Sequence, residues 1–282
     1  MAKIKGLIRM IRPVNCVMMG SAVIIGALVA SNLNLNPSLS LVLGFFVGFL
    51  LLASANTIND YYDREVDAVN EPTRPIPSGE VKPEEALIFA FVLSAFGLIL
   101  SFTLGIQCFV LSLLAWAISM YYATKGKEQG LIGNAMVSTC VAIPFIYGSL
   151  ITRKLNPLVV LFSLMAFLSN MGREVNKGIV DIEGDKLRNV KTMAITRGTE
   201  YAARVSALFY ISAVIISIIP QILRLTSWLY IPTVVAADMG FIYSSIKLMQ
   251  NSGRENARKV KNQVLIWMCV GLVAFIVGMI QL

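Results

Sequence analysis

The chain has 282 residues, of which 56% are hydrophobic and 14% are charged. Soluble domains are usually about 45–50% apolar and about 25% charged, so this composition excludes an ordinary soluble globule and favours a protein that lies in the lipid bilayer. The sequence contains no histidine, which excludes catalysis by an imidazole and any haem or zinc site with histidine ligands. Its four cysteines lie in apolar stretches and form no C-x-x-C pair, so we expect neither a disulfide framework nor a zinc site.

Apolar stretches long enough to cross a membrane follow one another along the whole chain. A spanning helix needs about 20 predominantly apolar residues, and we predict nine spans, at residues 14–31, 39–58, 86–105, 106–123, 131–151, 157–171, 202–223, 228–249 and 263–282. The first span has the basic start of a signal peptide, but the second follows almost at once and no A-x-A cleavage pattern separates them, so we interpret it as a membrane helix. The predicted fold is an all-α, polytopic membrane helix bundle with about nine transmembrane helices, a single domain over residues 1–282, and Asp-rich loops or helical caps on the cytoplasmic side.

Two of these spans have distinctive ends. The third and fourth meet at Gly105, which predicts a tight helical hairpin. The sixth is short, and its helix can continue into the polar stretch that follows it.

The charged residues are distributed unevenly between the loops of the predicted bundle. If the N-terminus is cytoplasmic, all Lys and Arg residues except Arg153, Lys154 and Arg224 lie on the cytoplasmic side. The positive-inside rule favours this orientation. It also explains the net charge of +8, so that the basic residues need not indicate binding to nucleic acid. With nine spans, the C-terminus then lies outside. All Asp and Glu residues except Asp238, which lies within the eighth span, are on the cytoplasmic side. We therefore expect a polar working surface that faces the cytoplasm.

The first long cytoplasmic loop begins with polar residues at a helical spacing. Asn59, Asp63 and Asp67 are spaced by four, so they form one ridge if the second span continues as a helix, with Asp60 on the flank. Like charges on one ridge repel each other, which predicts that a cation neutralises them. Oxygen ligands of this kind suit Mg²⁺, which binds through one or two carboxylates together with substrate phosphates.

The second long cytoplasmic loop carries both signs of charge at the same spacing. Arg173, Lys177, Asp181 and Asp185 form one ridge if they lie on one helix, with two cations followed by two anions. The two carboxylates can bind a metal ion, and the two cations can bind an anionic substrate that is coordinated to that metal ion.

Three further residues extend this expected anion chemistry. The stretch 69–79 holds three prolines and a glycine, which predicts a stiff loop that carries Arg74 near the carboxylates of the first motif. Tyr121 and Lys125 form a Y-x-x-x-K pattern in a third cytoplasmic loop, where Lys125 can reach a phosphate and Tyr121 can orient a substrate. If the two Asp motifs face each other across a cavity, they make a clamp for metal and diphosphate, because metal ions with Lys and Arg stabilise a departing diphosphate.

Four of these motifs, in this order, resemble the UbiA superfamily of intramembrane prenyltransferases. They are N-D-x-x-D-x-x-x-D at 59–67, R-P-I-P-S-G at 74–79, Y-x-x-x-K at 121–125 and D-x-E-G-D at 181–185; the R-P-V-N run at 12–15 also resembles the R-P-x-N start of the superfamily. Within it the chain is most like the archaeal branch. That likeness implies Mg²⁺-dependent transfer of a geranylgeranyl group from geranylgeranyl diphosphate to geranylgeranylglyceryl phosphate, which forms the diether core of archaeal lipids.

The resemblance also implies roles for individual residues. Catalytic roles fall to Asp63, Asp181, Lys125 and Tyr121; metal binding to Asn59, Asp63, Asp67, Asp181 and Asp185; and diphosphate binding to Lys125, Arg173, Lys177 and Arg74. An acceptor that carries a phosphate also needs cations, and an intramembrane carboxylate indicates a functional site, so we predict acceptor binding by Arg12, Asn15, Lys186, Arg188 and Asp238. The implied partners are a prenyl diphosphate donor, a lipid-phosphate acceptor and membrane lipid, with no nucleic acid and no obligate protein partner. One departure is that Gly178 follows Lys177, where many relatives have Lys-Asp, which leaves metal binding there to Asp181 and Asp185.

Two alternatives stay open at this point. A UbiA-type enzyme that prenylates an aromatic quinone precursor would use the same motifs, although an aromatic acid needs fewer spare cations than an acceptor phosphate. An ion-coupled membrane transporter would use Asp238 and the motif carboxylates as ion sites, but only Asp238 lies at depth and no inverted repeat is evident. A phosphatidyl-type alcohol transferase is excluded by the lack of a D-G-x-x-A-R run.

Overall fold

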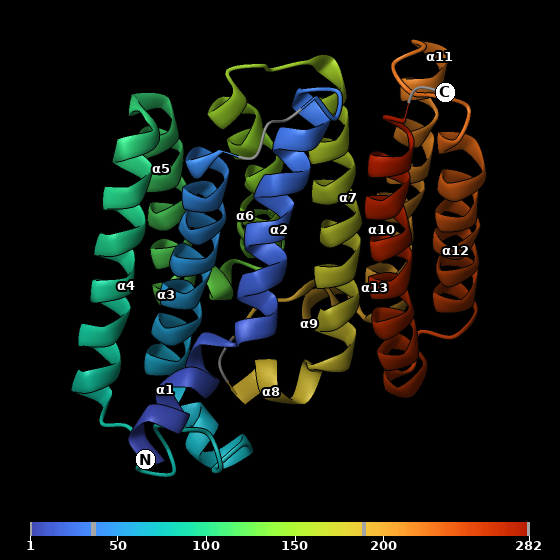
Figure 1. Cartoon of the computed structure of the whole chain (residues 1–282). Coiled ribbons are helices and arrows are strands. Elements are labelled where there is room, and N and C mark those ends of the chain that lie inside the picture. Colours follow the sequence, from blue (N-terminus) through green and yellow to red (C-terminus); the bar gives the residue numbers. More distant parts are fainter. Residues whose placement is uncertain (1, 35–37, 188–189, 281–282) are drawn as a thin grey trace. The chain divides into compact units, whose positions relative to one another are not determined.

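The computed structural model describes residues 2–34, 38–187 and 190–280, which form helices joined by short connections (Figure 1). Eight helical segments in these ranges are long and apolar enough to cross a membrane. They lie in α2 (Pro13–Ala30), α3 (Leu39–Asn70), α4 (Pro83–Leu104), α5 (Ile106–Thr124), α6 (Leu131–Thr152), α7 (Pro157–Val180), α10 (Thr199–Ser217) and α13 (Arg254–Val277). The predicted all-α membrane bundle is therefore confirmed.

The eighth predicted span corresponds to α12 (Tyr230–Gln250), which is not among these eight helical segments. Its sequence includes Asp238, Lys247 and several Ser and Thr residues, which lower its mean hydropathy. It nevertheless has 21 residues and connects α10 to α13 through short segments, including α11 (Ile219–Ile222) at one end. Because α10 and α13 pack along α12, all three can lie across the bilayer only if α12 crosses it too.

The chain forms two compact units. The first consists of Met1–Ala27, Asn36–Gly126 and Ile143–Lys154, and the second of Leu28–Leu35, Lys127–Ala142 and Leu155–Leu282. Whether they form the single domain predicted over residues 1–282 stays a prediction.

Helix α3 is the central element of the first unit. It packs against α4, α5 and the short N-terminal helix α1 (Ala2–Ile11). Its 32 residues span about 48 Å at 1.5 Å per residue, well beyond the roughly 30 Å of a hydrocarbon core. The helix therefore continues through the first Asp motif, as predicted, and carries it past the apolar segment.

Small residues and hydroxyl groups allow the helices of the first unit to approach closely. Ser54 and Ser94 lie 2.6 Å apart, oxygen to oxygen, between α3 and α4, and the Trp116 indole N–H donates to Ser94. A Cβ atom at Gly148 of α6 would lie 2.1 Å from the Val23 carbonyl oxygen of α2. Close packing of this kind stabilises helix pairs in lipid, where the hydrophobic effect does not drive association.

The second unit is built on α7, α10, α12 and α13, with η1 (Gly126–Gln129), α8 (Ile182–Leu187) and α9 (Met193–Arg197) among the shorter elements of the chain. Helix α10 packs closely on α7 at Gly172. A Cβ atom at this position would lie only 2.5 Å from the Tyr210 ring, and the Ser206 hydroxyl donates to the Gly172 carbonyl over 2.7 Å. Tyr210 and Phe241 belong to the buried core of this unit.

The second polar motif is not one continuous helix, so the ridge predicted from Arg173 to Asp185 is wrong beyond Lys177. Helix α7 does run on past the predicted span, but it ends at Val180, and Asp181 leaves helical geometry with φ −102° and ψ 13° before α8 begins. Asp is a weak helix former because its carboxylate competes for backbone groups. Asp185 therefore lies on α8, where its N–H donates to the Asp181 carbonyl over 2.8 Å.

Candidate active site

The last turns of α3 present the polar residues of the first motif. The side-chain oxygen of Asn59 is buried and has no hydrogen-bond donor among the described residues. Asp63 is half-buried, and Asp67 is almost fully buried with a side-chain exposure of 2%. An unsatisfied buried oxygen is costly in a folded protein, so Asn59 points to a ligand that donates or coordinates at this position.

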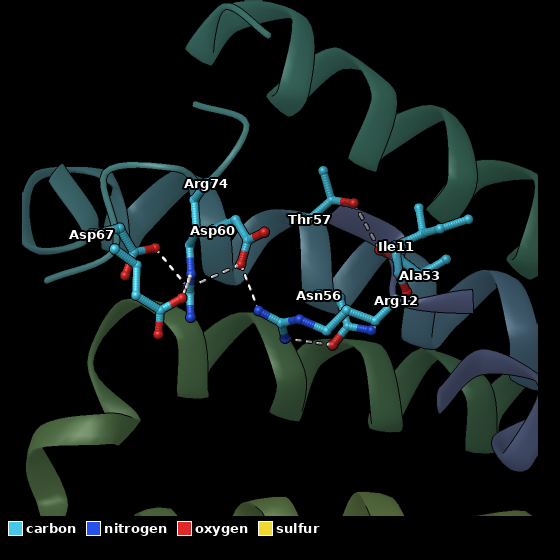
Figure 2. Close-up of polar contacts among 9 residues, drawn as sticks. Ile11, Arg12, Ala53, Asn56, Thr57, Asp60, Asp67 and Arg74 are labelled. Atoms are coloured by element: carbon cyan, nitrogen blue, oxygen red, sulfur yellow. Dashed lines mark hydrogen bonds and ion pairs between the residues drawn. The ribbon is translucent and has the colours of Figure 1, made fainter. Parts of the chain in front are cut away.

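Asp60 connects the acidic helix to two arginines, as Figure 2 shows. Its side chain is 7% exposed; one oxygen lies 2.7 Å from Arg12 Nη2 and 3.6 Å from Arg74 Nη1. Arg74 also lies 2.7 Å from Asp67 and 2.7 Å from Glu71, and Arg12 donates to Asn56 Oδ1 over 3.1 Å. These pairs hold both guanidinium groups against the carboxylates of α3.

The predicted flank position of Asp60 is on the Asp67 side of the ridge. At 3.6 residues per turn, a spacing of seven returns a side chain to nearly the same face, whereas a spacing of eight drifts by about 80°. Asp60 and Asp67 consequently share a face and share Arg74. The signal in the sequence is the 56–60–67 pattern, which the four-residue reading of Asn59, Asp63 and Asp67 passed over.

Arg12 occupies a break between two helices. Its φ of 53° is in the left-handed region, Pro13 begins α2 without an N–H donor, and the carbonyl of Ile11 instead accepts from Asn56 Nδ2 over 2.9 Å. The unusual backbone is thus compensated by an amide from α3. This local arrangement directs the Arg12 side chain to Asp60.

The charge of Arg74 is secure over the physiological range. Partial burial alone would lower the pKa of Arg74, but the hydrogen bond from Arg74 to Glu71 and the charges of Asp67 and Asp60 outweigh it and raise that pKa above its ordinary value. Because the pKa of Arg74 is higher in the folded than in the unfolded protein, its ion pairs contribute their full stability at every pH below the unfolded pKa. Arg74 therefore keeps its proton at neutral and moderately alkaline pH.

The second unit gathers its charges around the end of α7. The buried carboxylate of Glu174 lies 3.1 Å from Arg173 Nη1 and 3.5 Å from Lys177 Nζ. Arg173 Nε is itself buried without a hydrogen-bond partner among the described residues. Half-buried Asp181 caps the same helix, so cations and a candidate metal ligand lie at one helix end. Glu174 had not been singled out.

The remaining predicted residues lie in varied places. Tyr121 is exposed near the end of α5, and Lys125 follows that helix as its exposed C-cap. Asn15 is exposed in the first turn of α2, Lys186 is exposed on α8, and Arg188 lies outside the described residues.

Asp238 is separated from the other predicted residues of the second unit. It lies on α12, where it accepts a hydrogen bond from the Ser217 hydroxyl over 2.7 Å. Ser217 ends α10, about 27 Å along that helix from Thr199 at 1.5 Å per residue, whereas α9 and the second motif are at the Thr199 end. The acceptor role predicted for Asp238 stays a prediction without support from its position.

Comparison with known proteins explains this set of residues. The profile of the UbiA prenyltransferase family matches residues 19–277. The chain belongs to the UbiA prenyltransferase family. It is 33% identical to the digeranylgeranylglyceryl phosphate synthase of Methanosphaera stadtmanae, over 96% of this chain and 98% of that protein. It is 35% identical to the synthase of the same name from Methanocaldococcus jannaschii, over 100% and 99% of the two chains.

Solved structures agree with the family membership. A structure described as giving structural and mechanistic insights into digeranylgeranylglyceryl phosphate synthase in membranes superposes with a TM-score of 0.86 at 34% identity, covering all of both chains. A UbiA homologue from Archaeoglobus fulgidus bound to DMAPP and Mg²⁺ has a TM-score of 0.68 at 18% identity, over 95% of this chain and 98% of that chain, and shares the fold. This chain is accordingly a multi-pass membrane prenyltransferase.

The residues present fit a magnesium ion of the kind that the family uses. No group of three or more Asp, Glu, Cys or His side chains converges on one point within the described parts of the chain. Mg²⁺ does not need such a cage, because it keeps several waters and binds through one or two carboxylates plus substrate phosphates. The unsatisfied Asn59 oxygen beside Asp63 supplies oxygen ligands of the required type.

Proposed function

We propose that this UbiA family member transfers a geranylgeranyl group from geranylgeranyl diphosphate to geranylgeranylglyceryl phosphate, with Mg²⁺, to form the diether core of archaeal membrane lipids. The observation that carries the proposal is the full-length similarity to proteins named digeranylgeranylglyceryl phosphate synthase. The matched regions cover 98% and 99% of two of those relatives. The abundance of cations around the acidic motifs agrees with two phosphorylated substrates.

In the first unit, Asn59, Asp63 and Asp67 would hold Mg²⁺, and Arg74 and Lys125 would donate to phosphate oxygens. Bound Mg²⁺ neutralises negative charge that develops on the leaving diphosphate. Asp60 holds Arg74 at the face that carries Asp67, so the guanidinium is in place before a substrate arrives. Fixed donors of this kind avoid reorganisation at the moment of reaction.

In the second unit, Asp181 and Asp185 would bind metal, and Arg173 and Lys177 would donate to phosphate. Glu174 holds both cations at one end of α7. In the reaction, the bond from the allylic carbon to the diphosphate oxygen breaks, the acceptor hydroxyl oxygen bonds to that carbon, and its proton is released. Tyr121 would orient one of the substrates; Arg12, Asn15, Lys186, Arg188 and Asp238 stay predictions for acceptor binding.

The charge distribution supports a proposed orientation in the membrane. The positive-inside rule supports a cytoplasmic N-terminus and an active site that faces the cytoplasm. Nine crossings, with α12 among them, would place the C-terminus outside. Cysteines introduced near each terminus and labelled from one side of sealed vesicles test this orientation. We expect only one terminus to be labelled from each side, because labelling of both from the same side requires an even number of crossings.

A direct assay tests the activity. The purified protein would receive Mg²⁺ and geranylgeranyl diphosphate with either geranylgeranylglyceryl phosphate or 4-hydroxybenzoate, and mass spectrometry would identify the products. We expect a doubly prenylated glyceryl phosphate, abolished by EDTA and reduced at least about 100-fold in Asp63→Ala and Asp181→Ala, while the surface variant Glu255→Ala stays active. Prenylated benzoate as the sole product would move the enzyme to quinone synthesis and reject the proposal.

A further inference from the structure

Helices α7 and α13 lie against each other in an antiparallel register that two hydrogen bonds define. Arg254 Nε donates to the Val180 carbonyl over 3.0 Å, and Asn176 Nδ2 donates to the Ala257 carbonyl over 3.2 Å. Moving forward along α13 therefore means moving backward along α7. One turn beyond Ala257 is Lys261, and one turn before Asn176 is Arg173, so these two cations lie opposite each other.

The electrostatic environment of Lys261 agrees with this register. Lys261 interacts with the charges of Asp181, Arg173, Lys177 and Arg258. Three of these four interacting charges are cations. Juxtaposed like charges are unfavourable, so the arrangement suggests an additional anion at this face.

The carboxylates nearby are already engaged. Glu174 pairs with both Arg173 and Lys177, and Glu183 pairs with Arg254 over 2.8 Å. In contrast, Arg258 and Lys261 form no ion pair with a carboxylate in the described ranges. The buried Nε of Arg173, also without a partner there, is a polar group that a bound anion would satisfy.

We propose that the face of α7 and α13 that carries Arg173, Arg258 and Lys261 binds the phosphate group of the acceptor, and that Arg258 and Lys261 select a phosphorylated acceptor over an unphosphorylated one. The inference rests on the proposed function and names the determinant of its acceptor specificity. A phosphate monoester carries a charge of about −1.5 to −2 at neutral pH, which matches the two cations left without carboxylates. In this assignment Arg173 serves the acceptor phosphate, whereas Lys177 stays with the donor diphosphate.

The test compares two acceptors in the same enzyme preparation. Wild type, Lys261→Gln and Arg258→Gln would be assayed in full-length form with geranylgeranyl diphosphate and Mg²⁺, using either geranylgeranylglyceryl phosphate or geranylgeranylglycerol. Each Gln variant should raise the KM for the phosphorylated acceptor about tenfold, the effect of losing one charge-assisted hydrogen bond. The KM for the donor and the turnover of the unphosphorylated acceptor should change less than about twofold.

Matched variants separate charge from structure. Lys261→Arg should restore the preference for the phosphorylated acceptor. Lys259→Gln removes a cation from the same helix that pairs instead with Glu255 over 3.5 Å, and it should behave as wild type. An unchanged preference in both Lys261→Gln and Arg258→Gln, or a rise in the donor KM rather than the acceptor KM, would overturn the inference. Failure of the wild type to use the phosphorylated acceptor would instead reject the proposed function itself.

Discussion

The guanidinium of Arg74 lies 2.7 Å from the carboxylate of Asp67, whose side chain is nearly inaccessible to solvent. Removing one member of a buried ion pair leaves the other charge desolvated and unpaired. We expect Arg74→Gln to lower the free energy of unfolding by about 3 kcal/mol, measured by thermal unfolding in detergent without substrates.

The control for Arg74→Gln is an exposed pair. Lys259 and Glu255 lie on the surface of α13, where such a pair contributes about 0–1 kcal/mol. A loss as small in Arg74→Gln as in Lys259→Gln would show that Asp67 finds another cation or accepts a proton.

Ligand binding should reveal the role of Asn59. Its side-chain oxygen has no donor in the described structure, so Asn59→Ala should leave the melting temperature without ligands nearly unchanged. Mg²⁺ with geranylgeranyl diphosphate should raise the melting temperature of wild type, because a ligand that binds the native state stabilises it. The rise should be much smaller in Asn59→Ala; a full rise in the variant would remove Asn59 from the metal site.

Close packing between α7 and α10 makes a second stability prediction. A methyl group at Gly172 would collide with the Tyr210 ring and approach the Ser206 carbonyl. Overpacking of this kind costs about 1–3 kcal/mol, so Gly172→Ala should unfold at a lower temperature. Gly271 has no atom within 4 Å of the corresponding position, and Gly271→Ala should be neutral or slightly stabilising.

The position of Asp238 gives an expectation that differs from its predicted acceptor role. Since Asp238 bonds to Ser217 at the far end of α10, Asp238→Asn should keep the acceptor KM within about twofold, because an amide oxygen can still accept from the hydroxyl. Steady-state kinetics with both substrates would decide the matter. An acceptor KM that rises tenfold or more would return Asp238 to the acceptor site.

The helices and the family were accessible from the sequence because hydropathy and motif order are local properties of the chain. The continuation of α3 through the first motif followed from its regular spacing. The end of α7 at Val180 was missed, since a spacing of four looks the same whether or not the helix breaks at Asp181. The shared use of Arg74 by Asp60 and Asp67 was also missed, because it depends on how a non-helical loop folds back onto α3.

The register between α7 and α13 could not be predicted either. Lys261 and Arg173 are far apart in the chain, and only the hydrogen bonds of Arg254 and Asn176 to facing carbonyls place them opposite each other. Hydropathy identifies both helices but carries no information about which residues of one face the other. The acceptor determinant proposed above therefore required the structure.

Gly105 is the single residue between α4 and α5. Its φ of 124° is an angle that residues other than glycine rarely adopt. On either side of it, Phe102 contacts Phe109 edge to face, and Ser101 lies 2.9 Å from Ser112. Because a single residue links the two helices, no polar loop separates them in the nascent chain. They should consequently enter the lipid together as one helical hairpin, so that biosynthesis handles the two crossings as a single insertion event.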